Sequence, residues 1–323
     1  MTIIQFSEHG NPAEVLKTKS VSIQEPNEGE VRVKILATPI HPANLLQVAG
    51  QYGSGPELPA IPGAEGVGEV VEVGAGVDHL KPGLKVLLTG LEGTWRTEVT
   101  ASAQAFTPAP PGNVEQLAML AVNPVTAHLL LTTFTELSEG DWILQSAANS
   151  AVGELVSQLA ALRGFNVVNV VRRPELLGKA DQTTLLDGPD LAQRVAAVTG
   201  DVQIKLALDS VGGETFERLV EATGYGGTVV NFGNLSGKNP QLDLGRLISK
   251  KIDVRGFWLQ DWYQTAGPEK IQAALGALIP LIASGQLVTK IDSRYPLEEI
   301  KQAVVRAMES GRDGKVLLTP LAQ

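Results

Sequence analysis

The sequence predicts an α/β protein with a doubly wound parallel sheet and a second, strand-rich domain. From about residue 121 onwards, short apolar strands alternate with helices, which is the pattern of a doubly wound sheet. Before that point the chain is rich in turns and β-branched runs, and helical periodicity is almost absent. A chain of 323 residues is also long enough for two domains.

The strand-rich domain is expected over residues 1–120. VRVKILAT (31–38) and VGEVVEVGAGV (67–77) are β-branched runs bounded by proline and glycine. LKPGLKVLL (80–88) predicts a turn followed by another strand. The last segment, residues 289–323, predicts strand, helix and strand, and we expect it to complete this domain.

The doubly wound domain is expected over residues 121–288. It contains a predicted helix from Ser150 to Arg163 and another near 268–284. Its predicted strands are, in chain order, DWILQSA, NVVNVVRR, VQIKLALDSVG, GGTVVNFGN and KIDVRGFWL. Because the last two are apolar and an unpaired sheet edge favours association, we expect a homodimer in which these domains pair edge to edge.

Composition excludes several classes of function. The chain contains no cysteine, so it has no disulfides, no thiolate nucleophile and no zinc site that requires sulfur. Its net charge of −9 argues against a nucleic-acid partner, because phosphate binding requires a basic surface. No segment reaches ~18 uninterrupted apolar residues, and the start, MTIIQFSEHG, has the character of neither a signal peptide nor a transit peptide. We therefore expect a cytoplasmic protein that acts on small molecules and has no membrane partner.

A strand, turn and helix at residues 142–163, WILQSAANSAVGELVSQLAALR, stand where a Rossmann fold has its pyrophosphate loop. The G-x-G-x-x-G fingerprint is incomplete, since only Gly153 occupies its last position. A glycine at that position lets the helix pack closely on the sheet. The alternative is an ordinary strand-to-helix turn capped by serine and asparagine.

The next predicted strand ends in VVRRPE, with Arg172 and Arg173 ~20 residues after the loop. A domain that selects NAD has an acidic residue there, which binds the ribose 2′-OH. Two guanidinium groups instead favour the 2′-phosphate of NADPH, because their forks of donors pair with phosphate oxygens. The alternative is a solvated basic edge.

Tyr52 stands alone among small residues in the stretch QVAGQYGSGPELPAIPGAEG (47–66). A phenol hydroxyl is neutral at pH 7 and can donate a proton or a hydrogen bond. Gly53 and Gly55 would let this loop approach a substrate closely. The alternative is a tyrosine that only packs a turn.

These motifs, in this order, resemble the medium-chain dehydrogenase/reductase superfamily and, among its zinc-free members, the 2-enoyl thioester reductases of the mitochondrial trans-2-enoyl-CoA reductase type. The most specific motifs are GTWRTE (93–98) and RGFWLQDW (255–262), since quinone reductases usually have a different first turn and lack the tryptophans of the second motif. The chain departs from these relatives at Ala151, where glycine is common, and in the short segment between Arg173 and Gly200.

The resemblance also argues against a metal. Zinc-dependent members have an early cysteine ligand and a histidine in a G-H-E stretch, where this chain has Gly63, Ala64 and Glu65. His41 precedes Pro42 without partner ligands, and we interpret it as a polar loop residue.

The resemblance implies a GroES-like catalytic domain joined to an NADPH-binding Rossmann domain. It implies NADPH-dependent reduction of the C=C bond of 2-enoyl thioesters carried by CoA or acyl-carrier protein. A hydride reaches the β-carbon in such a reaction, and Tyr52 is implied as the group that assists protonation. Two alternatives stay open: a quinone or general activated-alkene reductase, and a non-catalytic nucleotide-binding or structural protein.

Trp258 and Trp262 follow a predicted strand end, where doubly wound sheets bind ligands, so they are candidates for the wall of a substrate pocket. Core packing is the alternative for both. Helix capping is the alternative for Asn123 and Thr126, and an exposed surface position is the alternative for Lys315. The cofactor-binding residues that the resemblance implies are Asn123, Thr126, Ser146, Asn149, Ser150, Ala151, Val152, Gly153, Arg172, Arg173, Gly233, Phe257, Trp258 and Lys315.

Overall fold

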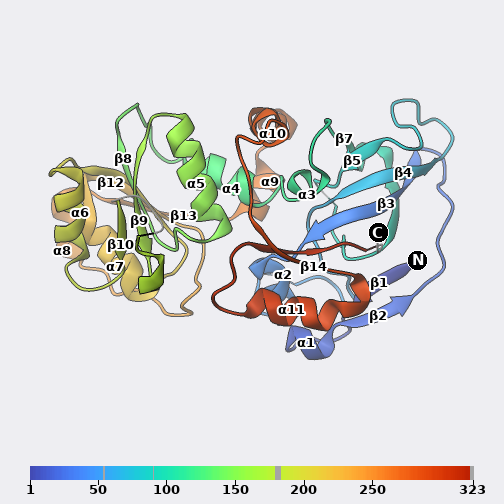
Figure 1. Cartoon of the computed structure of the whole chain (residues 1–323), viewed down its shortest axis with the longest axis horizontal. Helices are drawn as coiled ribbons and strands as arrows, with labels where there is room; N and C mark the ends of the chain where they lie inside the picture. Colours follow the sequence, from blue (N-terminus) through green and yellow to red (C-terminus); the bar gives the residue numbers. More distant parts are fainter. Residues whose placement is uncertain (54, 90, 179–182, 321–323) are drawn as a thin grey trace. The chain divides into compact units, whose positions relative to one another are not determined.

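The structure is a computed structural model that describes all residues except 54, 90, 179–182 and 321–323. The chain divides into two compact units (Figure 1). Unit 1 comprises Met1–Val122 and Leu275–Gln323, and unit 2 comprises Asn123–Ala274. Within the described residues, no helix is long and apolar enough to cross a membrane.

The boundary at which the chain returns from unit 2 to unit 1 lies earlier than expected. We expected residues up to 288 to belong to the Rossmann domain, whereas the contacts assign the chain from Leu275 onwards to unit 1. Helix α10 (Pro268–Ala283) therefore crosses the division. The helical period reveals that this helix exists, but it does not reveal which core its two halves join.

Unit 2 is built on one six-stranded sheet in which every neighbouring pair is parallel. Its strands are β8 (Trp142–Gln145), β9 (Asn166–Val171), β10 (Thr184–Leu186), β11 (Ile204–Asp209), β12 (Thr223–Asn231) and β13 (Asp253–Gly256). Their spatial order, β10-β9-β8-β11-β12-β13, is the 3-2-1-4-5-6 order of a Rossmann fold. The predicted doubly wound sheet is confirmed, with the short β10 as a strand that the sequence did not reveal.

Helices cover both faces of this sheet. On one face, α6 (Leu191–Thr199) and α7 (Gly213–Ala222) bury Val195, Phe216 and Leu219 in a core with strand residues of the sheet. On the other side, α5 (Ala151–Leu162) packs against β9 and against α4 (Asn123–Leu130). The remaining helices of unit 2 are α8 (Leu244–Lys250) and α9 (Leu259–Thr265).

Unit 1 is built on a seven-stranded sheet and a separate two-stranded ribbon. The ribbon consists of β1 (Thr2–Gln5) and β2 (Lys17–Ser20). The larger sheet contains β3 (Glu30–Pro39), β4 (Val67–Val73), β5 (Lys85–Leu87), β6 (Glu98–Ser102), β7 (Thr107–Pro108), β14 (Ile291–Tyr295) and β15 (Lys315–Leu318). Its path runs β14-β15-β3-β4-β5-β7, and β6 also pairs with β3.

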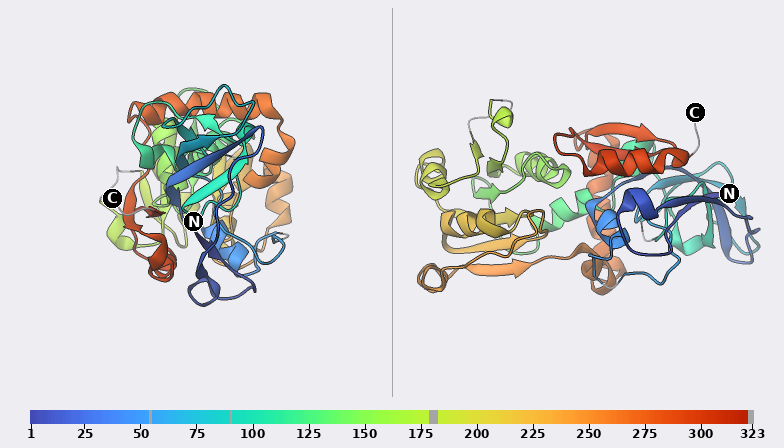
Figure 2. Two further views of the ribbon diagram at one scale, coloured as in Figure 1. Left: turned by 90° about the vertical axis from the view of Figure 1, so that its right-hand side faces the viewer. Right: turned by 90° about the horizontal axis from the view of Figure 1, so that it is seen from below.

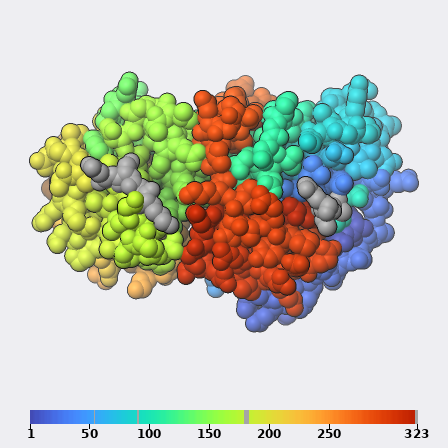
Figure 3. All heavy atoms as spheres, viewed as in Figure 1, coloured from blue at the N-terminus to red at the C-terminus, as the bar shows by residue number. Residues whose placement is uncertain are grey.

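The end of the chain is part of unit 1 because β15 pairs antiparallel with the end of β3. Helix α11 (Ile300–Met308) packs along β14 and β15 (Figure 2, red) and presents its outer side to solvent (Figure 3, red). The other helices of unit 1 are α1 (Pro12–Val15), α2 (Pro42–Val48) and α3 (Val114–Leu117).

The turn between β8 and α5 brings the helix against its own loop. A Cβ atom placed on Gly153 would lie 2.7 Å from both Cα and O of Ala148 and 2.8 Å from O of Ala147. All three atoms belong to the backbone, so a side chain could be accommodated only by moving the helix. This close approach is the role that glycine has at the end of the Rossmann fingerprint.

We expect Gly153→Ala to lower the free energy of unfolding by about 1–3 kcal/mol, because the added methyl group overpacks the turn. Gly276→Ala in α10 is the matched control, since a Cβ there meets nothing within 4 Å. That variant should gain about 0.5–1 kcal/mol from helix propensity. Urea unfolding of both variants measures the difference, and equal effects would contradict this account of the turn.

Candidate functional site

The strand order of unit 2 reverses between β8 and β11, and open α/β sheets bind ligands at such a point. Ser146 directly follows β8, and Asp209 ends β11. The Ser146 hydroxyl donates to Oδ1 of Asp209 over 2.6 Å, and both side chains are almost fully buried. This hydrogen bond joins the two strands at the reversal.

Asp209 collects three more hydrogen bonds. Its Oδ1 accepts from the backbone N–H of Val211 at 3.1 Å, and its Oδ2 accepts from the backbone N–H of Gly212 at 2.7 Å. The side-chain amide of Asn231, at the end of β12, donates to Oδ2 at 2.8 Å. A buried carboxylate requires such donors, and here they hold the ends of three strands together. Sequence reasoning missed Asp209, although an acid at the end of a buried apolar strand was a signal for it.

The loop between β8 and α5 is formed by capping and by one strained residue. Ser150 is the N-cap of α5, and its hydroxyl accepts from the N–H of Gly153 at 3.1 Å. Ala147 has a φ of 46°, a left-handed conformation in which a Cβ costs roughly 1–2 kcal/mol. Asn149 is exposed at the turn, and Ala151 with Val152 begins the helix. Serine capping, the feature of the alternative interpretation of this turn, is therefore present. The turn also lies at the point where the strand order reverses, as a pyrophosphate loop does.

The buried side-chain amide of Gln145 forms hydrogen bonds next to this loop. Gln145 Nε2 lies 3.0 Å from the carbonyl of Gly153, 2.9 Å from the hydroxyl of Ser157 and 2.7 Å from Oδ1 of Asn169. These acceptors belong to α5 and β9, so Gln145 ties the helix start to the neighbouring strand.

Arg172 and Arg173 directly follow β9, next to β8 in the sheet. Arg172 is exposed, whereas Arg173 is half-buried. The Arg173 guanidinium lies 3.6 Å from Oε1 of Glu175, whose side chain is 62% exposed. Such an ion pair is worth little in water, so it leaves the guanidinium available to a phosphate.

The other predicted residues of unit 2 occupy varied positions. Asn123 and Thr126 are buried in α4. Gly233 follows β12, and a Cβ on it would lie 3.0 Å from the carbonyl oxygen of Ser210. Ser210 itself follows β11, and its hydroxyl is buried without a hydrogen-bond partner in the described part of the chain.

Three aromatic residues follow β13. The Phe257 ring packs edge-on against Phe134, with centroids 5.7 Å apart. Trp258, the N-cap residue of α9, is 44% exposed. Trp262 is half-buried and lies edge-on to Tyr263, with ring centroids 5.2 Å apart.

The residues that follow β8, β9, β11, β12 and β13 lie at the same edge of the sheet, because these strands are parallel.

Tyr52 belongs to unit 1, in a loop that follows α2. Its side chain is half-buried. The next residue, Gly53, has a φ of 55°, which glycine adopts without strain.

His41, expected as a polar loop residue, directly precedes α2 as its N-cap and is buried, with 3% of its surface exposed. Its Nδ1 lies 3.0 Å from Nζ of Lys315, and its Nε2 lies 2.6 Å from Oε1 of Glu65. Because a lysine amine donates, Nδ1 accepts and Nε2–H donates to Glu65. Burial lowers the pKa of His41, the Lys315 charge lowers it further, and Glu65 acts in the opposite direction.

Lys315, expected among the cofactor contacts or on the surface, is 4% exposed at the start of β15. Burial lowers the pKa of Lys315 to about 7. Glu65 Oε2 accepts from the backbone N–H groups of Ala121 at 2.6 Å and Val122 at 2.9 Å. Among the described residues, no group of three or more His, Cys, Asp or Glu side chains is arranged to hold a metal ion.

Comparisons with known proteins agree with this architecture. Residues 27–111 match the family model of the alcohol dehydrogenase GroES-like domain, and residues 151–278 match that of zinc-binding dehydrogenases. The human protein named enoyl-[acyl-carrier-protein] reductase, mitochondrial, is 36% identical over 97% of this chain and 87% of its own length.

Two solved structures illustrate the breadth of the family. A protein from Bacillus thuringiensis, described as a candidate NADPH:quinone reductase, is 32% identical with a TM-score of 0.89, over 99% of both chains. Etr1p in complex with NADP and crotonyl-CoA is 28% identical with a TM-score of 0.88, over 98% of this chain and 99% of its own. A further structure is the heterodimer of Etr1p and Etr2p, mitochondrial 2-enoyl thioester reductases of Candida tropicalis; it has a TM-score of 0.86 and 28% identity, covering 98% of this chain and 99% of that one.

The expectation of a cytoplasmic protein is wrong by this comparison, because the curated relatives are named as mitochondrial proteins. Composition could not reveal this, since the fold itself does not depend on the compartment. The relationship extends over nearly the whole chain, across both units and their family models. The chain therefore belongs to the medium-chain dehydrogenase/reductase superfamily and, within it, to the family of the enoyl thioester reductases.

Proposed function

We propose that this protein reduces the C=C bond of 2-enoyl thioesters with NADPH. The observation that carries the proposal is the relationship to enoyl reductases over 97% of the chain. The sites in the two units fit this chemistry. Unit 2 would be the NADPH-binding domain and unit 1 the catalytic domain.

The carboxyl edge of the unit 2 sheet fits a dinucleotide. The start of α5 presents backbone N–H groups where a pyrophosphate binds, and Gly153 permits a close approach. At the same edge, the buried Ser210 hydroxyl has no hydrogen-bond partner among the described residues and could bind a polar group of the cofactor. The residues that we propose to contact the cofactor there are Asn123, Thr126, Ser146, Asn149, Ser150, Ala151, Val152, Gly153, Arg172, Arg173, Gly233, Phe257 and Trp258.

Arg172 and Arg173 would select NADPH through its 2′-phosphate. They follow β9, the position at which NAD-specific domains have an acid. Both guanidinium groups can pair with phosphate oxygens. Among the described residues, Glu175 forms an ion pair with Arg173 at 3.6 Å.

Tyr52 would assist the protonation. When bound, NADPH supplies the hydride that reaches the β-carbon of the substrate. Negative charge then develops on the thioester oxygen, and a proton is added at the α-carbon. The Tyr52 hydroxyl can donate to the developing enolate, and its glycine-rich loop brings no bulky neighbour to the substrate. Trp258 and Trp262 would form part of the acyl pocket.

Reduction of a quinone or another activated alkene is the second candidate. It is favoured by the similarity to a candidate NADPH:quinone reductase, with a TM-score of 0.89. NADPH oxidation with crotonyl-CoA, with a quinone and without substrate separates the two functions. Activity with the quinone alone would contradict the enoyl thioester proposal.

The protein would form a homodimer through β13. This strand is at the edge of the unit 2 sheet, and all of its residues are exposed. Nearby on α8, Leu244 is 67% exposed and Ile248 is 77% exposed. An open edge beside exposed apolar side chains is suited to pairing with a second copy.

We expect the unmodified protein to bind NADPH at least about tenfold more tightly than NADH, since each charge-assisted bond to phosphate is worth about 1.5–3 kcal/mol. Replacing Arg172 and Arg173 with alanine should weaken NADPH binding far more than NADH binding. Arg246→Ala is the control: it removes a half-buried guanidinium of α8 that pairs with Glu221, and it should change neither affinity. Fluorescence titration with each cofactor measures this, and equal affinities in the unmodified protein would reject the assignment.

We expect Tyr52→Phe to lower kcat with crotonyl-CoA by at least about tenfold, within the range of roughly 10²–10⁴ that general acid catalysis supplies. NADPH affinity and thermal stability should hardly change, because the ring is kept. Tyr225→Phe removes a hydroxyl from a 57% exposed tyrosine of unit 2 and should leave kcat unaltered. Full kcat in Tyr52→Phe would show that another group supplies the proton, and a loss of stability would support the packing alternative.

We expect Val254→Pro to convert the dimer into a monomer. The N–H of Phe257 donates to Asn231 of β12, and because successive donors of a strand alternate in direction, the N–H of Val254 faces the open edge. Proline removes this donor without disturbing the pairing with β12. Val254→Thr keeps the N–H and should remain dimeric. Light scattering at micromolar concentration measures the molar mass of each variant. A monomeric mass for the unmodified protein would contradict the proposed dimer.

A further inference from the structure

Glu65, His41 and Lys315 form a buried chain of ionisable side chains, which we call the charge chain. Their exposed fractions are 1%, 3% and 4%. Lys315 Nζ lies 3.0 Å from His41 Nδ1, and His41 Nε2 lies 2.6 Å from Glu65 Oε1. Apolar neighbours such as Ile40 and Val316 belong to the core of unit 1. The proposed reaction uses none of these three side chains directly.

The charge chain is electrically balanced only when Lys315 is protonated. A neutral His41 then lies between an ammonium and a carboxylate. Loss of the Lys315 proton leaves the Glu65 carboxylate with its three hydrogen-bond donors but without a cation in the charge chain.

The charge chain is connected to two segments of unit 1. Glu65 binds the N–H groups of Ala121 and Val122, the last residues before the chain enters unit 2. His41 is the N-cap residue of α2, and its N–H donates to Oδ1 of Asn44 at 3.0 Å.

The far end of α2 leads to Tyr52. Gly50, with a φ of 74°, follows the C-cap residue Ala49, and the N–H of Gln51 donates to the carbonyl of Leu46 at 2.8 Å. The N–H of Gly10 also binds the carbonyl of Val48 at 3.2 Å. Helix α2 therefore connects His41, its N-cap residue, to the loop that carries Tyr52.

We propose that Glu65, His41 and Lys315 act as one positioning site for the Tyr52 loop, and that the protonated state of Lys315 holds this loop in its productive position. The inference rests on the proposed function, because it assigns the charge chain to the placement of the proton-donating tyrosine. Lys315 acts here through His41 and α2.

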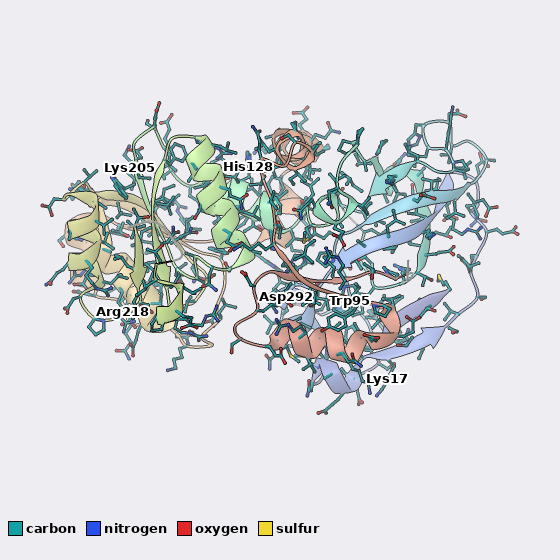
Figure 4. The ribbon with its side chains drawn as sticks, in the orientation of Figure 1. Lys17, Trp95, His128, Lys205, Arg218 and Asp292 are labelled. Carbon is teal, nitrogen blue, oxygen red and sulfur yellow. The ribbon has the colours of Figure 1, made fainter. Side chains whose placement is uncertain are left out.

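Lys315 is the member of the charge chain that changes its charge near neutral pH. Burial lowers the pKa of Lys315 to about 7; Glu65 raises it and Arg312 lowers it. Burial lowers the pKa of His41 and so favours the neutral form, in which Nδ1 accepts from Lys315. On the neighbouring β14, Asp292 (labelled in Figure 4) is bound by Arg306, which lowers the pKa of its carboxyl to about 2, so it stays charged. Arg294 of the same strand is paired with Glu115.

Activity and stability should therefore respond to pH in opposite directions. As pH rises through about 7, Lys315 loses its proton, the loop is released and kcat falls. The pKa of an unfolded lysine lies near 10.4, so between about pH 7 and that value the unfolded chain binds the extra proton. The contribution of Lys315 to the free energy of unfolding consequently increases with pH over this interval.

The test compares kcat with crotonyl-CoA and the free energy of unfolding from about pH 6 to about pH 9, on either side of the pKa of Lys315. The unmodified protein should lose kcat with a midpoint near pH 7 while it becomes more stable. Lys315→Met should have no such step and a kcat about 10- to 100-fold below the plateau, as expected for a misplaced catalytic group. Lys315→Arg, which stays charged, should retain the plateau to higher pH. Lys301→Met, at an exposed position of α11, is the control with unaltered profiles.

Two measurements do not depend on a variant at position 315. In Glu65→Gln the carboxylate that raises the pKa of Lys315 is gone, so the midpoint should move to lower pH. In the unmodified protein labelled with ¹³C at the lysine ε-carbons, one lysine signal should titrate near pH 7.

The inference is overturned if Lys315→Met keeps the pH step of the unmodified protein, or if it changes only the KM for NADPH, as a cofactor contact would. It is also overturned if no lysine signal titrates below about pH 9. An unmodified protein that is inactive with crotonyl-CoA at every pH, while the lysine signal titrates as expected, contradicts the proposed function instead.

Discussion

The hydrogen bond from Ser146 to Asp209 is the interaction on which the cofactor edge of unit 2 depends. The two residues are separated by 63 positions in the sequence, yet they end neighbouring strands at the reversal of the sheet. The Asp209 carboxylate is stable in its buried position because four donors bind it. Those donors fix the ends of β8, β11 and β12, and the turn that leads into α5 begins at the fixed end of β8.

Unit 1 has a comparable constraint in its charge chain. The chain lacks cysteine, and Ala64 occupies the position of the histidine in the G-H-E stretch of zinc-dependent relatives. The adjacent Glu65 is directed to His41 and to two backbone N–H groups. The three ionisable groups are buried together and satisfy one another by hydrogen bonds.

The substrate class depends on side chains rather than on the fold. The same fold serves quinone reductases and enoyl thioester reductases, so the backbone alone does not separate them. The relationship to enoyl reductases connects this chain to thioester reduction, and Tyr52 and Trp258 are the side chains that we propose to take part in it. Nicotinamide chemistry is common to both reactions, and the protein contributes the position of the proton donor and the shape of the pocket.

The parallel sheet, the capped start of α5 and the place of Gly153 could be predicted from the sequence, because hydrophobic periods, caps and close backbone approaches are local. The short β10 was not predicted, because three residues show too little hydrophobic pattern. The environments of His41, whose partners lie 24 and 274 positions away, and of Asp209 are formed by the folded chain. A hydrogen bond between residues so far apart in the sequence forms only once the strands have paired, so no local sequence pattern can predict it.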